Sequence, residues 1–510
     1  MKQIYKKLLA AALGVSMLLS MVGCGQNDTS GQTQTGGENE AKVLTIVTAK
    51  ELDNLTTLTM NKENNIACGL VYETLVAYED GEIVPELAEE WGWDETNTVL
   101  TFKLRQDVAF TDGAAFNAES VKEILDFDRS NPNFSGIKGI YNIESVEVVD
   151  EYTVAVHYAA PCFSYINDFC FQNVAGMMSP NVFEAKNFQT FTDVVGTGPY
   201  IREEMISGDC TRFVRNENYW GEAPYYDEVV IKYIPEASSR LQALQTGEVD
   251  LIYGADLLSY DDYNQALSLD GIEGAINDGN TLTRNLVLNA SSEILSDLKV
   301  RQAIAYAVNK EEITKGLTYG YETPATSLFA PGAPYTDITY NSTWSYDLDK
   351  ANALLDEAGW VMNESTGIRE KDGQQLSLNY TYWTDLSLAQ DMALAIKTQL
   401  AEVGIDVTTT GQDQMTWWTE GVAGNYDITT WNTEGSYTEP HKFLQESLGA
   451  DPHAISLQAL EDFQSYSDAV NAFSTSADPE VVQSAIATAL NVSNDNVIDL
   501  PISYSKDLVV

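Results

Sequence analysis

The sequence predicts a mixed α/β protein with more than one folded lobe. Two hydrophobic periods alternate along the chain, one near 2 that is typical of strands and one near 3.6 that is typical of helices. The segment from residue 43 to residue 510 is also too long for one compact core, because single cores stop growing at roughly 250–300 residues. We therefore expect at least two lobes built from both kinds of element.

Two segments in the first third of the chain predict strands. In VLTFKL (99–104), Leu100, Phe102 and Leu104 alternate with polar side chains, as in a strand with one buried face. SVEVVDEYTVAVHY (145–158) predicts a hairpin that turns at Asp150–Glu151. The same alternation places His157 on the solvent face of the second arm.

Three stretches predict a helix that ends at a glycine. The first begins at Ser238 as an N-cap and ends at Gly247, before a predicted strand VDLIY (249–253). The second spans residues 387–400 and ends before Gly404, where the strand IDV begins. The third lies in residues 346–358 and ends at Gly359.

The first 42 residues predict export and a lipid anchor. A basic start with Lys2, Lys6 and Lys7 precedes an uncharged apolar run, residues 8–23, as in a secretory signal. The run is shorter than the about 20 residues that span a bilayer. It ends at Gly23-Cys24, which resembles the lipobox of bacterial lipoproteins, so we expect residues 1–23 to be removed and Cys24 to be lipidated. An ordinary signal and an uncleaved anchor are the alternatives. Residues 24–42 are polar and rich in Gly, Gln and Thr, which predicts a flexible tether.

Charge and cysteine content exclude several classes of protein. The formal net charge is −48, which repels nucleic acid and anionic lipid, so no nucleic-acid partner is expected. Beyond Cys24 the chain has Cys68, Cys162, Cys170 and Cys210, too few for a disulfide framework in so long a chain. We expect four buried thiols, with one disulfide as the alternative.

No catalytic or nucleotide-binding motif is found in the sequence. GxxxxGK[ST], HExxH, CxxC and GxSxG are all missing, and 76 acidic residues prevent any catalytic carboxylate pair from being singled out. We therefore predict that the chain is not an enzyme and needs no cofactor.

One stretch, WNTEGSYTEPHKFLQESLGADPH (431–453), gathers candidate site residues. It contains Trp431, Glu434, Tyr437, His441 and His453. The two histidines are too irregularly spaced for a helical metal pair, and no cysteine lies nearby to complete a closed metal site. The stretch alone leaves a metal site, a catalytic site and a pocket wall open.

Nine ordered blocks resemble the family 5 extracellular solute-binding proteins, which are the dipeptide, oligopeptide and nickel receptors of ABC importers. The blocks are VYETLVAYEDGEIVPELAEEW (71–91), LTFKLRQDVAFTDGAAFNAESV (100–121), GTGPYI (196–201), VRNENYWGEAPYYDEVVIKYIP (214–235), RLQALQTGEVDLIYG (240–254), VRQAIAYAVNK (300–310), LFAPGAPY (328–335), YDLDKANALLDEAGW (346–360) and DLPISY (499–504). The chain looks most similar to the nickel-binding branch, through RNENYWGE, SLFAPGAPY, IREKDGQ, EPHKFL and LPISY.

The resemblance implies a two-lobed α/β fold of the periplasmic-binding-protein type (type II, in the large family 5 form), with a ligand cleft between the lobes. Lobe I would comprise residues 43–288, lobe II residues 289–497, and residues 498–510 would return to lobe I, with the return expected to be truncated. The implied function is a monomeric, lipid-anchored receptor on the extracytoplasmic face of the cell membrane. It would deliver a solute to the permease subunits of an ABC importer and, through them, to the ATPase.

The resemblance also assigns roles within the stretch 431–453. In the nickel receptors an aromatic pair and a histidine face a metal chelate, and Trp431, Tyr437 and His453 fall at the matching places. His453 would fill an open coordination position of the transported metal. In the peptide receptors an aspartate three residues after the tryptophan binds the peptide amine, and Glu434 holds that place here.

Two departures from the nickel-branch pattern leave the identity of the ligand undecided. The first-lobe arginine of the nickel branch is missing, and Asn173 and Gly176 occupy that region; the aromatic and methionine near the N-terminus are replaced by Met60 and Asn65. Loss of a bidentate anion partner changes which ligand is held. A chelate of nickel or another divalent metal and a short peptide or other amine both remain, with Asn65 and Asn173 as further ligand-binding candidates. A secreted, lipid-anchored hydrolase is the alternative from another class.

Overall fold

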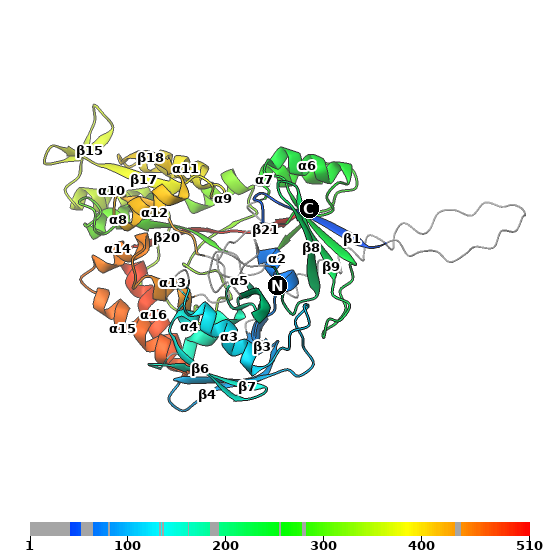
Figure 1. Ribbon diagram of the computed structural model, residues 1–510. Coiled ribbons are helices and arrows are strands. Elements are labelled where there is room, and N and C mark those ends of the chain that lie inside the picture. Colours follow the sequence, from blue (N-terminus) through cyan, green and yellow to red (C-terminus); the bar gives the residue numbers. More distant parts are fainter. Residues whose placement is uncertain are drawn as a thin grey trace, which may run out of the picture.

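The computed structural model describes residues 41–52, 65–79, 82–131, 134, 137–161, 163–183, 193–253, 257–277, 282–433 and 440–510. The described chain forms a mixed α/β structure of two lobes (Figure 1). The mixed fold class predicted from the two alternating periods is therefore confirmed.

Two sheets form the framework of the first lobe. One has the order β1-β10-β9-β8 and consists of β1 (Val43–Thr48), β10 (Glu228–Tyr233), β9 (Cys210–Arg215) and β8 (Tyr200–Ile206). The other is antiparallel, has the order β4-β5-β7-β6, and consists of β4 (Ala88–Trp93), β5 (Val99–Leu104), β7 (Thr153–Tyr158) and β6 (Ile143–Asp150). The predicted strand and hairpin are confirmed: Leu100, Phe102 and Leu104 are buried along β5.

The first-lobe core lies between these sheets and a set of short helices. Its helices are α2 (Asn65–Val71), α3 (Ala118–Asp128), α4 (Lys138–Tyr141), η4 (Phe163–Cys170), α5 (Gln172–Ala175) and η5 (Pro180–Phe183), beside the hairpin of β2 (Val76–Glu79) and β3 (Glu82–Pro85). The start of α3 is fixed by a capping box, in which Asn117 and Ser120 each accept from the other's backbone N–H.

A smaller unit of the first lobe joins chain segments far apart in sequence. It contains α6 (Ala237–Thr246), α7 (Tyr260–Leu267), β11 (Ala275–Asn277) and β21 (Asp507–Val509), and β21 pairs antiparallel with β11. Leu508 and Val510 are buried in the same hydrophobic cluster as Val47 and Leu241. The C-terminal strand thus packs in the first lobe, next to α6 in Figure 1.

A six-stranded sheet forms the centre of the second lobe. Its order is β13-β20-β12-β19-β17-β18, with β13 (Thr323–Pro324), β20 (Asp499–Tyr504), β12 (Thr283–Leu288), β19 (Ile428–Thr430), β17 (Ser377–Trp383) and β18 (Asp406–Gln412). A separate small sheet contains β14 (Val361–Asn363), β15 (Ile368–Lys371) and β16 (Gln374–Gln375).

Helices cover both faces of this sheet and create a core on each. One core packs against α8 (Leu298–Ala307), α9 (Lys310–Thr318), α10 (Leu348–Glu357) and α11 (Ala389–Ala401); the other contains α13 (His441–Glu446), α14 (Pro452–Gln458), α15 (Phe463–Thr475) and α16 (Pro479–Asp495). The helix α12 (Gln414–Val422) precedes β19. Successive residues of β12 enter opposite cores, Leu286 and Leu288 one and Val287 the other, as strand geometry requires.

The strands β12 and β20 carry the chain between the lobes. In the chain, β12 follows the first-lobe strand β11 and β20 precedes the first-lobe strand β21, and the two crossing strands pair antiparallel. The lobe limits 43–288, 289–497 and 498–510 remain our proposal, since the sheet that contains both crossing strands belongs to the second lobe.

Two local predictions need correction, and the others are confirmed. The helix α6 begins at Ala237 after Glu236, so Ser238 lies inside its first turn and is not the N-cap. VDLIY forms only isolated bridges, through Leu251 and Tyr253, and no strand. The three helices predicted to end at a glycine do so. Gly247, Gly359 and Gly404 all have positive φ, a conformation that residues with a side chain rarely adopt.

The structure also bears on the predicted burial of the cysteines and on membrane-spanning segments. Cys68 and Cys170 are buried as predicted, whereas Cys210 is half-buried, so its predicted burial was wrong; Cys162 lies outside the described residues. Within the described ranges, no helix has the length and apolar character required to cross a bilayer.

Candidate functional site

Four tryptophans of the second lobe form a continuous stack that includes the predicted ligand-binding residue Trp431. The rings of Trp417 and Trp431 lie 5.4 Å apart at 24°, those of Trp383 and Trp417 lie 6.3 Å apart at 26°, and Trp418 lies 5.9 Å from Trp431. They come from the end of β17, from α12 and from the residue after β19. Trp417 is buried, Trp431 and Trp383 are half-buried, and Trp418 is exposed. The stack is therefore an apolar wall with one open end.

This tryptophan stack lies at the boundary between the lobes. The ammonium of Lys50, just beyond β1 of the first lobe, lies 6.0 Å from the centre of the Trp383 ring. Trp417 is held in place by its indole N–H, which donates to Thr429 Oγ1 of β19 at 3.0 Å. A rigid aromatic surface facing the other lobe suits a solute with an apolar or planar body.

The lobes also touch directly at a second place. Gln445 of α13 donates through Nε2 to Ser164 Oγ of η4 at 3.2 Å and to Ser474 Oγ of α15 at 2.8 Å. Ser164 Oγ also donates to the Ser474 carbonyl at 3.5 Å. The second-lobe helix α15 also packs against η4 of the first lobe. We call this set of three residues the interlobe contact.

Several predicted site residues cannot be placed by their side chains. Glu434, Tyr437 and Cys24 lie outside the described residues. Asn65 begins α2 and Asn173 lies in α5, two first-lobe helices that pack against each other, but their side chains are outside the described set. Their ligand-binding roles stay predictions.

The packing of α2 and α5 explains one departure from the nickel branch. A Cβ on Gly176 would lie 2.8 Å from the Tyr72 Cβ and 2.3 Å from the Gln172 carbonyl oxygen, closer than van der Waals contact allows. No side chain, and hence no arginine, fits at this position without moving the backbone.

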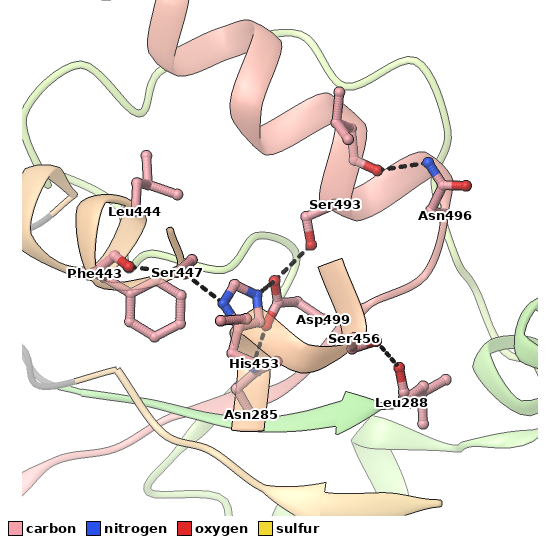
Figure 2. Close-up of polar contacts among 12 residues, drawn as sticks. Asn285, Leu288, Phe443, Leu444, Ser447, His453, Ser456, Ser493, Asn496 and Asp499 are labelled. Atoms are coloured by element: carbon pink, nitrogen blue, oxygen red, sulfur yellow. Dashed lines mark hydrogen bonds and ion pairs between the residues drawn. The ribbon is translucent and has the colours of Figure 1, made fainter. Parts of the chain in front are cut away.

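His453 is completely buried and takes part in a network of hydrogen bonds (Figure 2). Its Nε2 lies 2.8 Å from Asp499 Oδ2, and its Nδ1 lies 2.6 Å from Ser447 Oγ. Asp499 also accepts from Ser493 Oγ at 2.5 Å and from Asn285 Nδ2 at 2.6 Å. Both ring nitrogens are therefore engaged within the protein.

The Asp499 carboxylate favours the protonated form of His453. The Ser447 hydroxyl also lies 2.9 Å from the Phe443 carbonyl, to which it can donate. Nε2 faces a carboxylate, which only accepts, so this nitrogen carries a proton. Burial alone lowers the pKa of His453, but the charge and hydrogen bond of Asp499 outweigh it and raise the pKa above its ordinary value. The pKa of Asp499 is lowered: burial raises it, and the charge and hydrogen bond of His453 overcome that.

This geometry counts against the metal role predicted for His453. A metal binds a deprotonated imidazole nitrogen, and here Nε2 faces the Asp499 carboxylate and Nδ1 is hydrogen-bonded to the Ser447 hydroxyl, in a site with no solvent exposure. Coordination would require the Asp499 or the Ser447 contact to break. The role stays a prediction that this arrangement does not favour.

His441 lies in a different setting at the start of α13. Its ring packs edge-on against Phe473 at 5.2 Å and Tyr335 at 5.8 Å, and no carboxylate or carbonyl among the described residues accepts a hydrogen bond from it. Burial lowers its pKa to about 4, so the ring is neutral at pH 7. The prediction that His441 begins a helix is confirmed.

A second buried network lies on the same crossing strands. Arg284 of β12 donates to Glu322 at 2.9 Å, and Glu322 also accepts from Tyr260 OH at 2.7 Å and from Ser503 Oγ of β20. Arg284 further donates to the Ser387 carbonyl at 2.9 Å. This ion pair therefore links α7 of the first lobe with the second-lobe sheet.

Sequence reasoning missed Asp499, Asn285 and the tryptophans that surround Trp431. Asp499 is the one acid in the apolar run VIDLPISY, and an isolated acid in a buried strand signals a paired charge. The pair Trp417-Trp418, fourteen and thirteen residues before Trp431, was the available sign of the stack. Across the described ranges, no group of three or more His, Cys, Asp and Glu is placed to hold a metal ion.

The chain is similar to proteins of known role over most of its length. Residues 82–453 match the family model described as Bacterial extracellular solute-binding proteins, family 5 Middle. The Nickel-binding periplasmic protein of Escherichia coli (strain K12) is 30% identical over 455 residues, covering 87% of this chain and 85% of that protein.

Solved structures share the fold. NikA from Brucella suis in complex with Fe(III)-EDTA matches with a TM-score of 0.88 and 28% identity, over 92% of this chain and 94% of that one. DppA from Helicobacter pylori in complex with the peptide STSA matches with a TM-score of 0.72 and 22% identity, over 92% and 93%. The predicted two-lobed fold is thereby confirmed, and this chain belongs to the family 5 extracellular solute-binding proteins of ABC importers.

Proposed function

We propose that this chain captures a small solute at the boundary between its lobes and delivers it to the permease of an ABC importer. The tryptophan stack supports this most directly, because it presents a half-buried Trp431 on a rigid apolar surface facing Lys50 of the first lobe. Ligand would shift the lobes from open to closed and undergo no chemistry.

The ligand we propose is a chelate of nickel or another divalent metal with a small organic molecule. Trp431 would pack against the organic body, together with Tyr437. Similarity to the Escherichia coli nickel-binding protein and to NikA, solved with Fe(III)-EDTA, supports this class. A bare ion is not proposed, since the stretch 431–453 offers too few ligands for a closed site.

A short peptide or another amine is the second candidate. Glu434 supports it, because a carboxylate three residues after the tryptophan can pair with a positive amine. The absence of an arginine between residues 130 and 201 also weakens binding of an anionic chelate.

Calorimetry separates the two ligand classes. Nickel alone, nickel with L-histidine, and a set of di- and tripeptides are titrated into the purified chain, with Trp431→Ala alongside. We expect nickel–histidine to bind more tightly than nickel alone or any peptide, and Trp431→Ala to weaken it. Tight binding of metal-free peptides would move the assignment to the second candidate. Turnover of any probe would favour a hydrolase and overturn the receptor proposal.

We also propose that the mature chain is anchored by lipid on Cys24. A basic start, an uncharged run and Gly23-Cys24 support it, together with a polar tether. Cys24→Ala should leave uncleaved precursor or release the protein into the medium. A lipidated, membrane-bound product in that variant would contradict the proposal.

A further inference from the structure

The buried network of His453 contacts the chain on both sides of the predicted ligand-binding residues. Residues 431–433 precede Glu434 and Tyr437 in the sequence, and α13 with Ser447 follows them. We call these two described segments, 431–433 and 441–447, the wall flanks. Trp431 N–H donates to the Asn285 carbonyl at 2.9 Å, and Asn432 Oδ1 accepts from Asn285 N–H at 3.2 Å. The first flank is therefore bonded directly to β12.

The second flank reaches the same strand through three side chains. Ser447, directly after α13, is hydrogen-bonded to Nδ1 of His453; Nε2 of His453 donates to Asp499 of β20; and Asp499 accepts from the side chain of Asn285. Asn285 of β12 therefore connects both flanks. Its backbone is hydrogen-bonded to the first flank, and its side chain is connected to the second flank through Asp499 and His453. Asn285, His453 and Asp499 are all buried.

The ion pair is the central link in this chain of contacts. Asp499 accepts from three donors, on β12, α14 and α16, and only the contact to His453 leads on to α13. Without the two ring nitrogens of His453, the second flank has no bond to the crossing strands through this network. The first flank would keep its backbone bonds to Asn285, so the relative placement of the two flanks would be lost.

We propose that His453 is a positioning residue: with Asp499 it fixes α13 relative to Trp431 and the crossing strands, and so sets ligand affinity without touching the ligand. The inference rests on the proposed receptor function and adds a role for this histidine other than metal coordination. Because β12 and β20 connect the lobes, the same contacts couple the position of the wall flanks to the two crossing strands.

The test compares affinity with stability in matched variants. His453→Phe keeps a ring of similar shape and removes both ring nitrogens, His453→Gln restores one donor to Asp499, and Asp499→Asn keeps the shape and removes the charge. Leu457→Ala is the control, because Leu457 is fully buried on the same helix and has no part in the network. Affinity for nickel–histidine and for the peptide set is measured at a temperature where every variant is folded.

We expect His453→Phe to weaken each probe that the wild type binds by about tenfold, whether or not the probe carries metal. His453→Gln should recover part of this loss, and His453→Gln with Asp499→Asn should be non-additive. Leu457→Ala should lose stability and keep affinity within about threefold. A loss confined to metal-bearing probes would make His453 a ligand of the metal and overturn the proposal. An equal loss in Leu457→Ala would overturn it too, by reducing the effect to general stability.

A ligand-free measurement separates this inference from the proposed function. Hydrogen exchange is followed at the amides of Trp431 and Thr433, which bond to Asn285 and Thr283, and in α13. In His453→Phe the amides of α13 should exchange faster while those of Trp431 and Thr433 keep their rates, whereas Leu457→Ala should affect α14 alone. If no probe binds the wild type, the ligand proposal fails while this result still decides the role of His453. Unchanged exchange in α13 would overturn that role.

Discussion

His441 and His453 lie twelve residues apart, the first half-buried and the second completely buried, and their pKa values move in opposite directions. His441 is surrounded by Phe473 and Tyr335, whose rings offer no charge to balance a proton. His453 has Asp499 at one nitrogen and Ser447 at the other. The effect of burial on a histidine thus depends on whether its neighbours include a carboxylate.

The two settings also suit different tasks. A neutral aromatic neighbourhood packs the start of α13 against α15, whereas a charged pair joins helices to particular atoms of β12 and β20. Packing by rings tolerates small shifts, but a hydrogen-bonded ion pair requires a defined geometry. We therefore expect substitutions at His453 and Asp499 to cost more than substitutions at His441.

The largest loss of stability is expected when the carboxylate that distinguishes the surroundings of His453 from those of His441 is removed. Asp499→Ala removes the carboxylate that contacts the buried His453 ring and leaves only the more distant charge of Asp451 in its favour. Breaking a buried pair in this way costs about 3–5 kcal/mol. Chemical denaturation should show that loss, and the pKa of His453, followed by NMR, should fall below its ordinary value. An unchanged pKa would contradict the role given to Asp499.

A smaller effect is expected from pH at His441. Because its folded pKa is about 4 and its unfolded pKa is near 6.5, the unfolded chain binds more protons between these values. Stability should therefore fall by about 2–3 kcal/mol as the pH drops from 6.5 to 4. His441→Leu should remove this part of the acid dependence, seen as a flatter plot of unfolding free energy against pH.

Of the buried pair, His453 should give a pH dependence opposite to that of His441, and Asp499 one of the same sign as that of His441. The raised pKa of His453 adds stability that is complete below pH 6.5 and is lost as the pH rises through the folded pKa. The lowered pKa of Asp499 adds stability that is complete above about pH 4 and is lost as the pH falls through its folded value. In His441→Leu, the remaining optimum should therefore lie between about pH 4 and 6.5.

A still smaller effect is expected at the interlobe contact on α13. Gln445→Ala removes the hydrogen bonds to Ser164 and Ser474 that hold α13 and α15 against η4. A hydrogen bond of this kind contributes about 1 kcal/mol, so ligand affinity should fall by about fivefold with little loss of stability. Small-angle scattering should show a more open ligand-bound average. Unchanged affinity and unchanged compaction would remove the contact from the closing motion.

The smallest change in stability is expected at the third histidine, His157, which lies at the surface. His157 pairs with Glu147 at 3.1 Å on the surface of β7 and β6, where the Glu147 side chain is 62% exposed. Exposed pairs contribute about 0–1 kcal/mol. His157→Gln should thus change stability by less than about 0.5 kcal/mol, and a loss as large as that of Asp499→Ala would undo the comparison.

Much of the fold was predictable because local patterns and tertiary packing agree. The alternation in β5, the turn at Asp150–Glu151 and the stops at Gly247, Gly359 and Gly404 all appear in the structure. The failures are equally local. Nothing in the sequence distinguishes Ser238 at an N-cap from Ser238 one residue inside α6, and VDLIY has the composition of a strand without a partner to extend it.

The site was harder to predict because its contacts are distant in sequence. His453 was identified as a candidate, but its role depends on Asp499 and Asn285, and Asn285 and Asp499 lie 214 residues apart. A histidine near a tryptophan and a tyrosine suggests a ligand, whereas only the fold shows that a carboxylate and a hydroxyl occupy both nitrogens.

The position of β20 has a consequence for how the protein acquires its structure. This strand, residues 499–504, lies between β12 and β13 and supplies the only sheet partner of β13 within the described chain. Before it is in place, β12 presents an open inner edge of backbone donors and acceptors, of the kind that recruits other chains. Because closure of such distant pairs is entropically slow, the second-lobe sheet should be completed late in folding. A chaperone that shields β12 during that interval would act on the strand that later connects the lobes.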